Sequence, residues 1–406
     1  MVEHGHAVST DGERLLGGYS GRLLLLLSVG TTVVMTGRLA LAPVLPRVIE
    51  DLGISSGLAG VALTVMWAMV ALCRYPGGRL VDRLSRKTVL ATGLATATVG
   101  AALMLGATGY PTFLLASAVL GVGIGLWLPA VVVSVSDLFV ERRGQAYGVY
   151  EAFFNLAGVV AAGFALMVPA VFGWRDGYLA VVALLAVVGV LLHRWSAEPY
   201  EFAVPELGVR ETAGRVFGTR RIRRLVVAFA LLAFANEGAI AFLPTYLQVE
   251  TGLAPALASN AFAAFFVVGM LVNPLAGVLG DRFGALRVAA AAGLVSATGV
   301  GLLVLAEGRV LALLGVAVLA VGLTANWPVM LAYLMDAVPS GSVGGDFGAV
   351  GTVFIAVGSL GPGYVGLVAE RSGYGPAFVG LAVCLLAYAG VALWLARTAG
   401  PGYIEH

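Results

Sequence analysis

Twelve long apolar runs constrain this sequence more than any other feature. A transmembrane helix needs about 20 consecutive apolar residues, and runs of about this length recur throughout the 406-residue chain. Charged residues make up 11% of the chain, against about 25% in a soluble domain. These values exclude a soluble enzyme, a disordered chain and a nucleic-acid-binding protein. We therefore predict an all-α polytopic membrane protein with spans at 23–46, 57–77, 88–107, 111–136, 146–170, 177–193, 225–248, 258–280, 287–305, 310–334, 347–368 and 375–396.

The spans form two groups of six. A long polar stretch at 194–224 separates them, which predicts an N-terminal six-helix bundle at 23–193 and a C-terminal one at 225–396. Polar tails at 1–22 and 397–406 flank the two bundles. The arginines of the linker favour a short amphipathic helix that binds anionic membrane lipids.

Basic residues are unevenly divided between the two sides of this membrane protein. Of the 24 Lys and Arg residues, 18 fall on the side of both tails and the linker, and 4 fall on the other side. Cytoplasmic loops carry an excess of Lys and Arg. The count predicts a multi-pass protein of the cell or inner membrane with both termini in the cytoplasm.

Short motifs repeat between the halves. Gly78-Arg-Leu-Val-Asp82-Arg83 follows the second span, and Gly277-Val-Leu-Gly-Asp281-Arg282 follows the eighth. The same offset of 199 residues relates Pro129 to Pro328. Parallel repeats related by an axis along the membrane normal are an architecture of transporters, in which two similar bundles rock about a site between them.

These motifs resemble the loop signature of the major facilitator superfamily, Gly-x-Leu-x-Asp-Arg, although Ser85 stands where the family usually has glycine. The resemblance implies twelve helices in two bundles related by a pseudo-two-fold axis, and transport by alternating access. It also implies a cytoplasmic conformational latch, formed here by Gly78, Asp82, Arg83, Arg86, Glu141, Arg142, Asp281 and Arg282. The alternative is that these charges only set the topology.

Four ionisable residues lie within spans, where such groups are costly and usually functional. Arg38 stands eight residues before Pro46, which resembles the helix-1 pattern of organic-anion transporters in the superfamily. That likeness implies a substrate anchor, and a guanidinium suits a carboxylate. The alternative is an internal ion pair with Glu237. Arg74 is close enough to the cytoplasmic end for its side chain to reach the interface, and a functional role within the span is the alternative.

Two carboxyls are candidate proton carriers. Glu237 lies near the middle of the seventh span. Its carboxyl either carries the coupling proton or stays charged in a permanent ion pair with Arg38. Glu151 lies about five residues into the fifth span, where it either faces the cytoplasmic half of the cavity or reaches the interface. Asn236 occupies the repeat position equivalent to Arg38 and joins the predicted substrate-binding group.

Residues beside the repeated prolines complete the predicted substrate site. Trp127 precedes Pro129, and Asn326 and Trp327 precede Pro328. In the superfamily the corresponding helices line the cavity, which makes these side chains candidates for substrate contact. Packing within a bundle is the alternative reading of each aromatic residue.

These observations predict a secondary active transporter, most simply a symporter of a small organic anion such as a carboxylate with protons. The alternative is a proton-coupled efflux antiporter of drugs or metabolites. The arginine that proton-coupled members often have in helix 4 is missing near Ser117, and the antiporter proline of helix 5 is absent. We expect a monomer that is not an enzyme and has no cofactor, metal or nucleic-acid partner.

Overall fold

The computed structural model describes residues 14–15, 17–171, 173–201, 220–337 and 343–398. In these residues, twelve helical segments are long and apolar enough to span a membrane, which confirms the predicted fold class. Seven helices form the first half: α1 (Gly18–Leu39), α2 (Leu41–Leu52), α3 (Ser56–Arg83), α4 (Arg86–Leu105), α5 (Tyr110–Leu138), α6 (Arg143–Val171) and α7 (Gly177–Trp195). Seven form the second: α9 (Arg220–Val249), α10 (Pro255–Phe283), α11 (Ala285–Val304), α12 (Arg309–Ala337), α13 (Val343–Gly358), α14 (Leu360–Ser372) and α15 (Tyr374–Thr398).

Two of the twelve spans are broken helices. The first span contains α1 and α2, which are separated at Ala40, and α13 and α14 are separated at Ser359. Proline lacks an amide N–H and its ring clashes with the carbonyl four residues earlier. Pro43 stands four residues after Leu39, and Pro362 stands four residues after Gly358. The prolines therefore account for both breaks.

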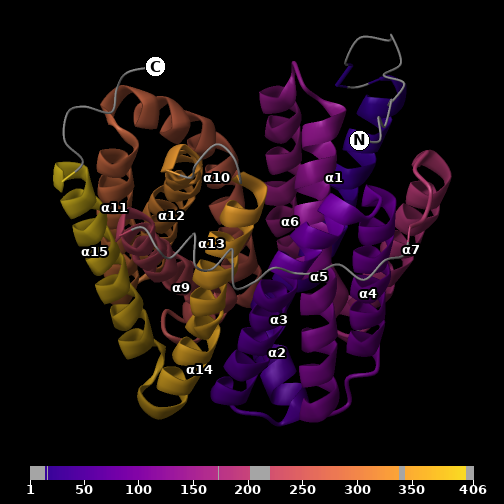
Figure 1. The fold of residues 1–406 in the computed structure, drawn as a ribbon. Coiled ribbons are helices and arrows are strands. Elements are labelled where there is room, and N and C mark those ends of the chain that lie inside the picture. Colours follow the sequence, from indigo (N-terminus) through magenta and orange to yellow (C-terminus); the bar gives the residue numbers. More distant parts are fainter. Residues whose placement is uncertain (1–13, 16, 172, 202–219, 338–342, 399–406) are drawn as a thin grey trace.

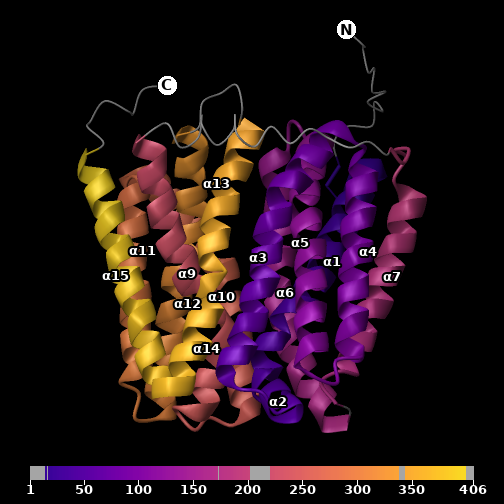
Figure 2. The same ribbon diagram turned by 60° about the horizontal axis from the view of Figure 1, so that its bottom comes forward.

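The helices run side by side in two bundles, one from each half of the chain (Figure 1). The beginning of α1 and the end of α15 lie at the same end of the molecule (Figure 2), which we name the terminal end. The opposite end, where α2 ends and α3 begins, is the far end. The predicted amphipathic part of the linker falls largely on 202–219, outside the described residues.

Direct contacts join the two bundles at the far end, where the first part of α3 meets α14 and the first residue of α15. The hydroxyl of Ser55 donates to Oε2 of Glu370 (2.9 Å), and the hydroxyls of Ser56 and Tyr374 are 3.0 Å apart. The amide of Gly363 donates to the Thr64 hydroxyl (2.9 Å). We name these contacts, with Gly60 and Gly366 between them, the far-end seal.

Glycines let the helix backbones meet within the far-end seal. A Cβ atom on Gly60 would lie 2.5 Å from the carbonyl oxygen of Pro362 and 3.2 Å from the Cα of Gly366. No ordinary side chain fits in that space without a shift of the backbone. The glycines thus make the close approach of α3 and α14 possible.

Candidate transport site

An ion pair between the two bundles lies next to the far-end seal. Nη2 of Arg38, at the last turn of α1, is 2.5 Å from Oε2 of Glu237 on α9. Both residues are 8% exposed, so the charges are removed from solvent together. The internal pair that the sequence left open as an alternative for Arg38 is the arrangement found here.

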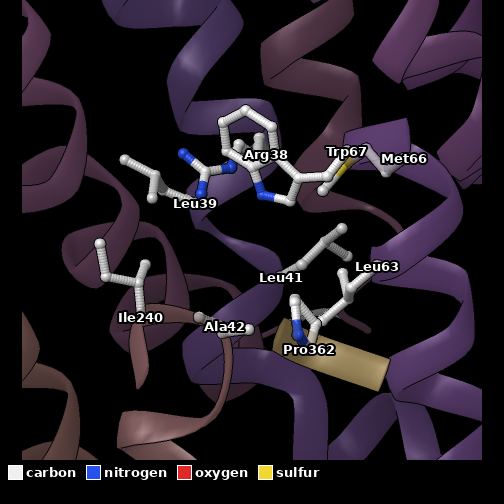
Figure 3. A pocket seen from close by; sticks show the side chains of 10 residues that line it. Arg38, Leu39, Leu41, Ala42, Leu63, Met66, Trp67, Ile240 and Pro362 are labelled. Atoms are coloured by element: carbon white, nitrogen blue, oxygen red, sulfur yellow. The ribbon is translucent and has the colours of Figure 1, made fainter. Parts of the chain in front are cut away.

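Neighbouring side chains support each member of the pair. The Trp67 ring of α3 lies over the Arg38 guanidinium, 4.0 Å from ring centre to Cζ (Figure 3). Such cation–π contacts are worth most where water is excluded. Nδ2 of Asn236 donates to the second carboxylate oxygen of Glu237 (3.1 Å). Trp67 was not among the sequence-based candidates, although its ring covers the Arg38 guanidinium.

A small cavity lies beside Arg38, between the ion pair and the far-end seal. Its other lining is mostly apolar and comes from both bundles, as Figure 3 shows: Leu41, Leu63, Trp67, Ile240 and Pro362. Leu41 begins α2 and Pro362 lies in the first turn of α14, so both broken helices border the cavity. Breaks of this kind are found at the binding sites of transporters, because they place irregular backbone at mid-membrane depth.

Arg74 points into the space between the bundles instead of toward the membrane interface. A Cβ atom on Gly351 of α13 would lie 3.2 Å from its Nε. The phenol of the buried Tyr150 on α6 is close enough to interact with its charge. In the described part of the chain, no carboxylate forms an ion pair with Arg74. Of the two readings that the sequence leaves open for Arg74, this position favours the functional one over a side chain that reaches the interface.

Glu151 of α6 has an exposed side chain and, like Arg74, is close enough to the Tyr150 phenol to act on it. Asn155, one turn later on α6, is buried, and its Oδ1 would lie 3.1 Å from a Cβ on Gly269 of α10. Residues four apart share a helix face, so Glu151 is on the face of α6 that meets α10 of the other bundle.

The residues beside the repeated prolines are packed inside their own bundles. Trp127 is fully buried, and its indole N–H donates to the Thr31 hydroxyl of α1 (3.0 Å). The side chain of Asn326 is fully buried and accepts from the Tyr388 hydroxyl of α15 (2.6 Å). Trp327 is partly buried against the ring of Phe354, with centroids 6.1 Å apart. In this conformation these contacts occupy the polar atoms of Trp127 and Asn326.

Trp127→Phe tests whether that indole contacts substrate. We expect a loss of about 1 kcal/mol of stability, because one buried hydrogen bond is removed, and an unchanged apparent affinity for substrate. Thermal unfolding and the concentration dependence of transport measure the two effects separately. A changed affinity with unchanged stability would instead favour the substrate contact predicted from the sequence.

The residues of the predicted latch lie at the terminal end. Arg86 forms its ion pair within the N-terminal bundle, with Nη2 2.6 Å from Oδ2 of Asp137 on α5. The other latch arginines and acids whose side chains are described are exposed: Arg83, Glu141, Arg142, Asp281 and Arg282. A Cβ on Gly78 would meet nothing within 4 Å. The side chain of Asp82 lies outside the description.

Twelve spans in two bundles, with charged groups buried between them, are an architecture found in membrane transporters. The sequence profile of the Major Facilitator Superfamily matches residues 27–259 and 225–403. The chain belongs to this superfamily. Its multi-pass fold and its place in a superfamily whose curated relatives are named transporters, not enzymes, agree with the prediction from the sequence.

The curated relatives share a low sequence identity with this chain. The chain is 25% identical to "Probable nitrate transporter NarT" of Staphylococcus aureus strain MRSA252 over 253 residues, which are 61% of this chain and 63% of the relative. The relative of strain JH9 is 24% identical over the same share. The chain thus matches less than two thirds of the length of these relatives.

Solved structures share the fold over nearly the whole chain. A D-xylose–proton symporter gives a TM-score of 0.77 at 15% identity, covering 92% of this chain and 97% of that one. A bacterial homologue of the human lysosomal transporter Spinster, inward-facing and unoccupied, gives 0.76 at 17% identity, covering 94% and 98%. At these identities the likeness shows the architecture alone.

Proposed function

We propose that this protein transports a small, planar, monovalent oxoanion, either nitrate or a carboxylate, between the two sides of the membrane. The observation that carries the proposal is Arg74, a guanidinium between the bundles with no carboxylate partner in the described residues. A charge in such a place needs a counter-charge. A substrate anion on the transport path supplies it.

The charge and shape of the site limit the kinds of anion that can be the substrate. By the 199-residue offset, the position equivalent to Arg74 in the second half is Asn273, which is neutral. With no carboxylate partner among the described residues, the single charge of Arg74 suits a monovalent anion better than a divalent one. The guanidinium fork matches two oxygens of a planar oxoanion, a geometry that nitrate and carboxylates share. The nitrate transporters among the relatives favour nitrate, and the helix-1 pattern around Arg38 favours a carboxylate.

Orientation and conformation follow from the distribution of charge. With 18 of the 24 basic residues on the side of the terminal end, we place that end in the cytoplasm of a cell or inner membrane. The far-end seal then closes the outside, and the exposed latch residues belong to an inward-facing conformation of a monomer that works by alternating access. In the outward-facing conformation the latch would close. Arg38, Asn236 and Glu237 complete the proposed site, and Glu151 faces its inner part.

Arg74→Gln is the test of this function. We expect an apparent affinity about 10- to 100-fold weaker, since a hydrogen bond to a charged group is worth about 1.5–3 kcal/mol. Arg74→Lys should lose less, because it retains the charge without the fork. The measurement is counterflow of labelled nitrate and of labelled acetate, formate and lactate in proteoliposomes.

The exposed Arg371 provides the matched control. Arg371→Gln removes one positive charge at the far end and should leave counterflow at the wild-type level. Full transport by Arg74→Gln would disprove the assignment. Counterflow of a sugar or a cationic dye, with none of the four anions carried, would disprove the substrate class.

A further inference from the structure

The ion pair of Arg38 and Glu237 joins the two bundles at a place where they must separate. Arg38 belongs to α1 of the first bundle and Glu237 to α9 of the second. The cavity beside Arg38 extends from the pair to Pro362, whose carbonyl oxygen packs on Gly60 in the far-end seal. When the far end opens, α3 and α14 move apart and the pair next to them is pulled open. Two opposite charges are then left in a largely apolar place.

We propose that one substrate anion on Arg38 and one proton on Glu237 together replace the broken ion pair, so that the protein takes up anion and proton in a one-to-one ratio from the far side. This inference rests on the proposed anion transport and adds to it the coupling ion, the stoichiometry and the residues that enforce them. Arg38 is the anion contact, and Glu237 carries the proton.

The coupling follows from the cost of leaving one charge unpaired. Removing one partner of a buried pair leaves an uncompensated charge, which is strongly destabilising. An anion bound without the proton would face the negative charge of Glu237. A proton bound without the anion would leave Arg38 alone. The far-end seal therefore closes again either with both ligands or with the original pair.

Arg38 is positioned to receive an anion after Glu237 has moved away. Trp67 belongs to the same bundle as Arg38 and covers its guanidinium at 4.0 Å, so this contact does not depend on Glu237. Arg38 also ends α1, and a positive charge is favoured at a helix C-terminus. The guanidinium thus keeps its position in either conformation.

The face of α3 that holds Arg38 continues to Arg74. Trp67 and Arg74 are seven residues apart, which on a helix means the same face and about 10 Å along the axis. Arg38 lies at the far-end side of this path and Arg74 at the terminal side. An anion released from Arg38 when the pair re-forms has the charge of Arg74 about 10 Å further along the same face of α3, toward the terminal end.

Few groups compete for the charge of Glu237. In the described part of the chain, Arg38 is the charged side chain that acts on it, the neutral side chain of Asn236 donates a hydrogen bond to it, and the Trp67 indole lies close by. The helices packed against α9, namely α2, α10 and α12 to α15, present to it none of the other described charged groups. Its proton is therefore linked to Arg38 and to whatever binds there.

Glu237→Gln in proteoliposomes tests the coupling. In the wild type, accumulation of nitrate, or of lactate corrected for its entry into protein-free liposomes, should rise about tenfold per unit of inward pH gradient, and should not respond to a potassium–valinomycin potential. In the variant, glutamine is neutral and resembles the protonated form of Glu237. It should lose the accumulation while anion exchange remains measurable above that of protein-free liposomes, which also shows that it is folded.

Three further measurements decide between this proposal and its rivals. Glu307→Gln removes an exposed carboxylate near the far end and should accumulate anion like the wild type. If Glu151→Gln abolishes the accumulation while Glu237→Gln retains it, the proton carrier is Glu151 and the proposal is overturned. Purified wild-type protein in weakly buffered detergent should take up about one proton per anion bound. Anion binding with no proton uptake would also overturn it.

Failure of the coupling and failure of the proposed function give different results. Wild-type protein that exchanges nitrate or lactate without any response to a pH gradient retains the anion function and refutes the coupling. Wild-type protein that neither binds nor exchanges these anions refutes the function itself.

Discussion

Arg38→Met is expected to lower the free energy of unfolding by about 3–5 kcal/mol. The substitution leaves the carboxylate of Glu237, which is 8% exposed, without its counter-charge. Asn236 still donates one hydrogen bond to it, but a neutral donor does not replace a guanidinium. Methionine fills much of the volume under the Trp67 ring, so the loss reports the charge rather than a cavity. Thermal unfolding of the purified protein in detergent measures the effect.

A second substitution separates charge from packing. Arg38→Met combined with Glu237→Leu removes both charges and should recover most of the lost stability, because an apolar pair of similar volume often equals a buried ion pair. Arg175, at the far end, pairs with the half-exposed Asp51. Arg175→Met provides the comparison for a more exposed pair and should cost about 0–1 kcal/mol from the lost charge. Equal losses at both sites would contradict the burial argument.

Gly60→Ala is expected to open the far end. A Cβ at this position lies 2.5 Å from the carbonyl oxygen of Pro362, and overpacking of this kind costs about 1–3 kcal/mol. This cost of overpacking applies only to the conformation in which the far end is closed and α3 contacts α14. The ratio of the two conformations should therefore shift by about 10- to 100-fold toward the one open at the far end, and proton-driven uptake should fall.

Spin labels on exposed positions at the far end can measure this shift. Cysteines at Glu50 and Glu307, in a chain with Cys73 and Cys384 changed to alanine, place one label on each bundle. Gly60→Ala should add a population with a longer distance. Gly163→Ala is the control, since a Cβ there meets nothing within 4 Å. An unchanged distance in Gly60→Ala would mean that the helices can part at this point without opening the far end.

The architecture could be predicted because lipid leaves so few choices. Backbone groups in the hydrocarbon core must be satisfied internally, so each apolar run becomes a helix, and all twelve predicted spans appear in the structure. The breaks in the first and eleventh spans were not predicted. Their signal was present in Pro43 and Pro362, which remove the hydrogen bonds to Leu39 and Gly358.

The site was only partly readable from the sequence. The cost of ionisable groups in a span singled out Arg38, Glu237, Arg74 and Glu151. That reasoning cannot tell which charges are paired, since pairing depends on how the bundles approach each other. It favoured the interface for Arg74 from its distance to the helix end, whereas the side chain lies against Gly351. Trp67 was missed because an aromatic residue in an apolar run looks like packing until the partner helix is in place.

The glycines of the far-end seal also affect how opening and closing respond to temperature. A long side chain that becomes fixed at an interface loses up to about 2 kcal/mol of rotamer freedom, whereas glycine has none to lose. Because Gly60, Gly363 and Gly366 provide much of the contact between α3 and α14, closing this end freezes few rotamers. The balance between the two conformations should therefore change little as the organism warms or cools.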